Sequence, residues 1–220
     1  MAIKVFCVGG SISVSEDQIV CAEEIVPYWN GLIGEKRTDH RIKEIGTPNE
    51  IMVPINRKIF RKFAEKILIV FDPGFSLYRV RKILGFRHSK IPNHYPSNSW
   101  WCVQEKCFPK WALVRRRPKY RVLMTTPVGL GESWTKQEEE IGREEVFQRA
   151  SSRFMVIAGI TDILLKRGRI NYNHWGPEDG TDETTKCAVS ILPNSFALSG
   201  RVEGFSRDSK LGAFVTLSCV

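Results

Sequence analysis

The stretch Ile67-Leu68-Ile69-Val70-Phe71-Asp72-Pro73-Gly74 joins an apolar run to three turn-forming residues. Five consecutive apolar residues, three of them β-branched, are typical of a strand that is buried on both faces. Aspartate, proline and glycine in succession favour a turn. The stretch therefore predicts a buried strand and the turn by which the chain leaves it.

Upstream of this strand, the sequence predicts one strand, two helices and a long loop. Residues 3–8 form an apolar-rich strand that Gly-Gly ends, and a capping box at 15–18 opens a helix that ends before Pro27. Residues 28–50 are polar and rich in glycine, so we expect a loop. Residues 55–66 repeat apolar side chains every four positions among lysines and arginines, which predicts an amphipathic basic helix.

Downstream, the sequence predicts one clear helix, a further segment whose pattern is ambiguous, and several antiparallel strands. Residues 75–86 favour a helix, and two strands are expected around a charged tip at 115–119, over 111–114 and 120–124. A capping box at 135–138 begins a helix whose apolar positions recur as far as Leu164. A helix of ~30 residues would span ~45 Å, so we expect a break near Gly142 or Gly159. After a loop at 171–185, three strands are expected at 187–192, 196–202 and 211–218.

These elements predict an α+β fold. Two or three helices would pack on a mixed, mostly antiparallel sheet, in a single compact domain or two tightly associated subdomains. The predicted division places an N-terminal α/β part at 1–124 and a long helix followed by antiparallel strands at 125–220.

The composition is that of an ordinary globular protein. Of 220 residues, 42% are hydrophobic and 26% charged, which is enough apolar material for a core without disulfides or metals. The six cysteines are scattered, so we expect reduced thiols. The chain begins without a signal-peptide layout and has no apolar run of ~18 residues, so we expect a cytoplasmic protein without a membrane span.

Charge is strongly segregated along the chain. Residues 57–121, here called the basic block, carry seventeen Lys/Arg and three Asp/Glu, a net charge of +14. The whole chain is +9, so the remainder sums to −5. Cations interleaved with aromatic residues favour binding to nucleic acid or another polyanion. The candidate residues are Arg57, Lys58, Arg61, Lys62, Lys106, Lys110, Trp111, Arg115, Arg116, Arg117, Lys119 and Arg121.

The basic block is also compatible with roles that do not involve a polyanion. The aromatic residues can belong to the core and the charges to an ordinary solvated surface. The block can also dock on the acidic remainder of a neighbouring copy, which would make the protein a structural subunit of a homo-oligomer or larger assembly. A third alternative is an enzyme with an unrecognised site. That site would be built on His174 and the acidic residues 178–183, or would use Cys7 or Cys21 with His40 or His174. Because no complete catalytic motif is present, we favour a non-enzymatic binding protein.

A zinc site is the single cofactor that the sequence suggests. His88, His94, Cys102 and Cys107 are residue types that zinc accepts, and the prolines between them predict a loop in which four ligands could converge. The alternative is that the four residues are incidental. No other cofactor is expected, because the Gly-Gly after the first strand lacks the spacing of a nucleotide-binding motif.

Three segments resemble a broad group of uncharacterised bacterial proteins. The matching residues are Trp111-Ala112-Leu113-Val114-Arg115, Ser133-Trp134-Thr135 with Gln137-Glu138, and Gly142-Arg143-Glu144-Glu145-Val146. The resemblance covers residues 108–218. It implies a bacterial or phage-like intracellular setting, and because the group has no established activity it implies no site residues.

Overall fold

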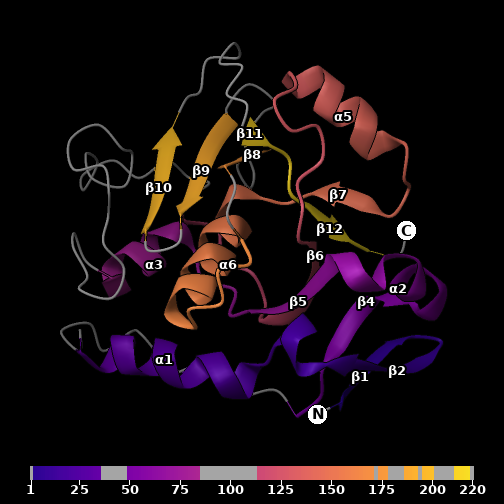
Figure 1. Ribbon diagram of the computed structural model, residues 1–220. Coiled ribbons are helices and arrows are strands. Elements are labelled where there is room, and N and C mark those ends of the chain that lie inside the picture. Colours follow the sequence, from indigo (N-terminus) through magenta and orange to yellow (C-terminus); the bar gives the residue numbers. More distant parts are fainter. Residues whose placement is uncertain are drawn as a thin grey trace.

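A five-stranded sheet, built around the apolar run described above, organises the fold (Figure 1). The run forms strand β5, Ile67–Asp72, and all six of its residues are buried. The strand order is β3-β5-β6-β12-β7, with β3 parallel to β5 and the remaining pairs antiparallel. The other four strands are β3 Ile19–Val20, β6 Lys119–Met124, β7 Phe147–Arg149 and β12 Val215–Leu217. The computed structural model describes residues 2–35, 49–84, 113–170, 173–177, 186–192, 195–200 and 211–218.

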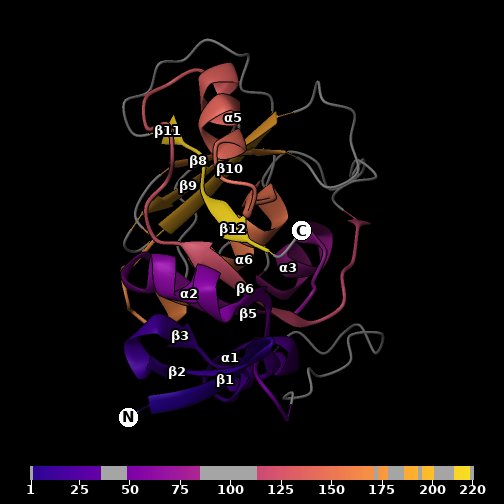
Figure 2. The same cartoon turned by 90° about the vertical axis from the view of Figure 1, so that its right-hand side faces the viewer.

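Two smaller sheets lie on either side of this central one (Figures 1 and 2). The first has the order β2-β1-β4 and begins with a hairpin whose turn is made by Gly9 and Gly10, both with positive φ. Its strands are β1 Ala2–Val8, β2 Gly10–Ser15 and β4 Met52–Asn56. The second has the order β10-β9-β8-β11. Its strands are β8 Asn173–Pro177, β9 Lys186–Leu192, β10 Ser195–Gly200 and β11 Leu211–Gly212.

Helix α6, Ser152–Leu164, is the central helix of the molecule. All thirteen of its residues are buried, because it contacts β5 on one side and β8, β9 and β10 on the other. A helix that is apolar around its whole circumference requires such a buried position. The other α-helices of the described part are α1 Ala22–Glu35, α2 Arg57–Phe63, α3 Leu77–Leu84 and α5 Trp134–Gly142. None of the described helices is long and apolar enough to cross a membrane.

The α+β class is confirmed, but the expected number of helices is wrong. The part of the chain that the structure describes contains five α-helices instead of two or three. Of the two predicted break positions, Gly142 is confirmed, whereas Gly159 lies inside the continuous helix α6. After Gly142 the chain forms strand β7, and α6 then begins with its own cap, in which the Ser151 hydroxyl accepts from the Phe154 amide. Strand β7 forms because it pairs with β12 and because Phe147 packs against Phe63. The five-stranded sheet takes strands from both sides of residue 124, and the division of the chain at that residue stays a prediction.

Three local predictions are corrected by tertiary pairing. The hydrogen bond between Ser15 and Gln18 closes only a short 3-10 turn. The two residues after this turn form β3 and pair with β5. The helix therefore starts only at Ala22, and it continues through Pro27. The predicted loop at 28–50 includes the end of α1, and the predicted loop at 171–185 includes β8. The expected strand at 111–114 is wrong at its described end, because Leu113 is exposed in a 3-10 turn and β6 pairs instead with β5 and β12.

Candidate functional site

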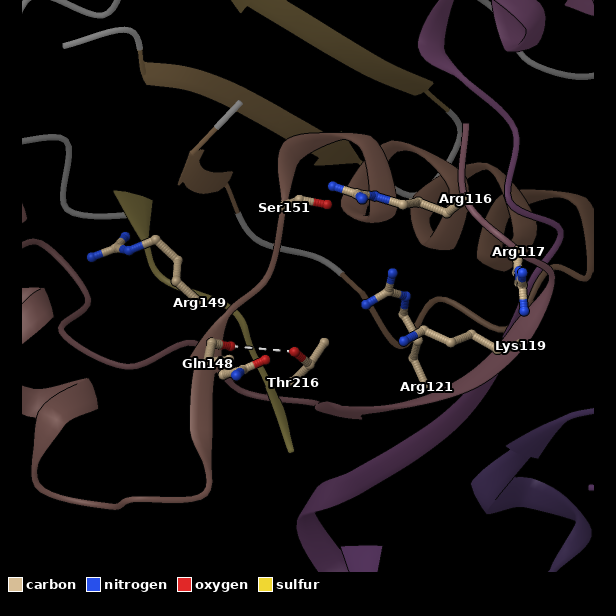
Figure 3. Close-up of a pocket in the computed structure, with 8 residues that line it drawn as sticks. All are labelled: Arg116, Arg117, Lys119, Arg121, Gln148, Arg149, Ser151 and Thr216. Atoms are coloured by element: carbon tan, nitrogen blue, oxygen red, sulfur yellow. Dashed lines mark hydrogen bonds between the residues drawn. The ribbon is translucent and has the colours of Figure 1, made fainter. Parts of the chain in front are cut away.

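A pocket of about 470 Å³ opens where β6, β7 and β12 meet the start of α6 (Figure 3). Five of the eight residues that line it carry a positive charge, and none is acidic. The lining residues are Arg116, Arg117, Lys119, Arg121, Gln148, Arg149, Ser151 and Thr216. The Thr216 hydroxyl donates to the Gln148 carbonyl at 3.4 Å, which ties two strands together at the pocket floor. The lining therefore favours an anionic ligand.

A buried carboxylate stands behind this pocket. Asp72, the last residue of β5, is fully buried and accepts from both terminal nitrogens of Arg153, at 3.0 and 2.7 Å. The Arg121 Nε donates to the same carboxylate at 2.8 Å, and so does the amide of Gly74, also at 2.8 Å. The carboxylate oxygens are thus occupied by protein donors, and Asp72 is not available to repel a ligand in the pocket.

Asp72 is held in its ionised form. Burial raises the pKa of its carboxyl, but the hydrogen bonds and charge of Arg153, the charge of Arg121 and the Gly74 amide outweigh burial, so the pKa lies below its usual range. One carboxylate and two guanidinium groups leave this cluster with a net charge of +1. The ion pairs therefore fix Arg121 in place at the pocket wall and leave the wall positive.

The turn after β5 positions the arginines at the pocket rim. The Arg116 amide donates to the Gly74 carbonyl at 3.0 Å, so the incoming chain lies directly on the turn. Gly74 has φ +73°, and a Cβ added there would lie 2.1 Å from the Arg116 carbonyl oxygen. Only glycine allows this approach. The Asp72-Pro73-Gly74 turn predicted from the sequence is thus the support on which residues 115–117 rest.

The rim cations are exposed and surrounded by like charges. Arg115, Arg116, Arg117 and Lys119 are all exposed, and within the described residues neither Arg117 nor Lys119 forms an ion pair. Burial lowers the pKa of Lys119, and the positive charges of Arg121 and Arg116 lower it further, against the opposing effect of Asp72. An anion bound here would relieve the repulsion among these groups.

Arg149 contributes to the pocket in a different way. Its guanidinium points away from the other cations, as Figure 3 shows, and lies 3.8 Å from the centre of the Trp134 ring. It donates to Gln137 at 2.8 Å and forms an ion pair with Glu138. Its charge is therefore already balanced by protein groups, and the positive rim consists of the cations on the β6 side.

The structure divides the predicted binding residues between two places. Arg116, Arg117, Lys119 and Arg121 line the pocket, and Arg115 is exposed beside it. On α2, Arg57 and Arg61 line a second pocket, Lys58 is exposed outside both, and Lys62 pairs with Glu144 at 2.7 Å. Outside the described residues lie Lys106, Lys110, Trp111 and the four proposed zinc ligands His88, His94, Cys102 and Cys107. The zinc site stays a prediction, and no group of three or more metal-ligating residues occurs in the part that is described.

Comparison with known proteins gives no match to this chain. No protein-family model, no curated protein sequence and no solved structure matches it. The resemblance of residues 108–218 to uncharacterised bacterial proteins stays a prediction, and the function is argued from the pocket itself.

Proposed function

We propose that this protein binds nucleic acid without catalysing a reaction, and that the pocket beside Arg117 and Lys119 receives backbone phosphates. One observation supports this above all: four cations on the β6 side line the pocket, no carboxylate lines it, and the carboxylate behind it is fully buried and occupied. Guanidinium and ammonium groups converging on one space are the usual partners of phosphate oxygens.

An extended polyanion fits this surface better than a single small anion. Exposed cations follow one another from Arg115 to Lys119, so several phosphates of one strand can be met at once. Each such contact releases condensed counterions, which makes binding strong at low salt and largely independent of base sequence. The +14 charge of the basic block would add attraction at longer range.

The state of Cys21 supports binding over covalent catalysis at that residue. Burial, followed by the charges of Glu23 and Glu24, raises the pKa of the Cys21 thiol to about 11. A thiol with this pKa is protonated at neutral pH and is a poor nucleophile.

Removing the rim charges should weaken binding and flatten its salt dependence. In the double variant Arg117→Gln, Lys119→Gln we expect about 25-fold weaker binding at ~0.1 M salt, because the counterion release of two phosphate contacts is lost. The slope of log K against log salt should fall by about 1.4, since each phosphate contact to a single strand contributes ~0.7. Fluorescence anisotropy with a labelled random-sequence single strand, between 50 and about 300 mM salt, measures both quantities.

A matched variant distinguishes the effect of the pocket cations on affinity from the effect of the protein's net charge. Lys136→Gln, Lys166→Gln removes two charges from exposed residues that lie outside the basic block and line neither pocket. We expect this variant to lose less than about threefold in affinity. Equal losses in the two double variants would contradict the proposal. Salt-sensitive self-association in light scattering, without nucleic acid binding, would favour the structural-subunit alternative instead.

A further inference from the structure

A second basic pocket, of about 530 Å³, lies between the β1–β2 hairpin and helix α2. Three of its lining residues are cationic, two carry hydroxyl groups, and none is acidic. The lining residues are Ala2, Lys4, Ser11, Ile12, Ser13, Arg57, Phe60, Arg61 and Ala64. Guanidinium, ammonium and hydroxyl groups around one space form a donor set suited to phosphate.

The local folds bring these donors to one side. In the hairpin Lys4 pairs with Ser13 and Phe6 with Ser11, so Lys4 and both serines share one face of the strands. On α2, Arg57 and Arg61 are four residues apart and therefore lie on the same helix face. The helix is fixed by its Asn56 cap, which accepts from the Ile59 amide at 2.9 Å, and by the buried Phe60.

The charges of this pocket are unbalanced by the protein. Within the described residues, none of Lys4, Arg57 and Arg61 forms an ion pair. Other surface cations of the same part do have carboxylate partners, namely Lys62 with Glu144, Arg167 with Glu24 and Arg169 with Asp17. Like charges four residues apart on a helix repel each other, so an anion between them would be stabilising.

Helix α2 connects this pocket to the first one. Figures 1 and 2 show α2 between the β1–β2 hairpin and β7. Phe63 of α2 packs against Phe147 of β7, with ring centres 5.3 Å apart, and the next two residues of β7, Gln148 and Arg149, line the first pocket. A single strand that passes over α2 can therefore reach both pockets.

We infer that the second pocket is a further phosphate site, and that one nucleic-acid strand occupies both pockets at once. The existence of the second site is independent of the first, whereas the shared ligand rests on the function proposed above. Two linked sites give a strand that reaches both a much higher affinity than a strand that reaches one, because the second contact forms at a high effective concentration.

Strand length tests this inference. Labelled random single strands of 4, 8, 16 and 32 nucleotides are titrated against three proteins. These are the wild type, the double variant Arg57→Gln with Arg61→Gln, and the double variant Arg117→Gln with Lys119→Gln. The wild type should gain affinity steeply once a strand reaches both pockets. Each double variant should lose that gain, by at least about 30-fold for the longest strand. The variant that combines all four substitutions should lose only slightly more of this length-dependent gain than each double variant loses. Lys136→Gln, Lys166→Gln, which removes two charges outside both pockets and outside the basic block, should keep the gain.

The outcomes separate the two claims. If the double variant Arg57→Gln, Arg61→Gln behaves like the control Lys136→Gln, Lys166→Gln at every length while the first-pocket variant is weakened, the second site is wrong and the proposed function stands. If only Arg57→Gln, Arg61→Gln is weakened, the second site stands, and the first pocket and the shared strand are wrong. If neither differs from the control, both proposals are wrong. Thermal unfolding of each variant verifies that the fold is retained.

Discussion

Replacing Asp72 by asparagine is expected to lower the free energy of unfolding by about 3–5 kcal/mol. The change leaves the guanidinium of Arg153, whose side chain is 2% exposed, without the carboxylate that balances its charge. It also removes the anchor of Arg121 at the pocket wall. Domains of this kind are stable by only about 5–15 kcal/mol, so the loss is a large share of the total. Denaturation in urea, followed by circular dichroism, measures it.

A second substitution distinguishes an unbalanced charge from general damage. Adding Arg153→Met to Asp72→Asn removes the buried charge and keeps an apolar side chain of similar length, so part of the lost stability should return. If the losses of the two single variants simply add, the ion pair is not the cause of the effect.

Acid provides an independent measure of the same pair. Because folding lowers the pKa of Asp72, its stabilising effect is complete above the unfolded value of about 3.9 and is lost as pH falls through the lower folded pKa. The free energy of unfolding of the wild type should therefore decline more steeply below about pH 4 than that of Asp72→Asn. Parallel pH profiles would contradict the assignment.

Local patterns in the sequence were enough to predict the elements that carry their own signal. Strand β5 is a continuous apolar run, and α2 and α3 repeat apolar residues with the period of a helix. Strand β7 was missed because it is three residues long and forms by pairing with β12, far along the chain. Such pairing is a tertiary effect that a short sequence window does not contain. Strand β8 was missed because its five residues include Gly176 and Pro177, which are typical of loops.

The rim of the candidate site could also be predicted from the sequence, but the support behind it could not. Clustered arginines at 115–117 are visible in any charge count. The contact between Asp72 and Arg153 joins positions 81 residues apart, and one sequence does not reveal which distant residues meet. Each partner did leave a signal: Asp72 directly follows five apolar residues, and Arg153 lies in the first turn of a mostly apolar helix. Charges placed in such surroundings must be paired, which was reason enough to look for a partner.

Gly74→Ala is expected to cost at least about 2 kcal/mol of stability and to weaken nucleic-acid binding by about tenfold where the protein still folds. Alanine is strained at φ +73°, and its Cβ would displace the Arg116 carbonyl, which lies 2.1 Å from that position. Residues 115–117 would then no longer lie on the turn that supports them, and their side chains would no longer be held at the pocket rim. Urea denaturation and anisotropy titration measure the two effects.

Gly34→Ala is the matched control for this change. Gly34 lies in α1 with no atom within 4 Å of an added Cβ, and alanine is the better helix former, so stability should rise by up to about 1 kcal/mol with binding unchanged. The same chemical change thus has opposite expected signs at two glycines. If Gly74→Ala instead shows wild-type stability and affinity, the turn after β5 does not hold the arginines, and contacts elsewhere in the chain must position the rim.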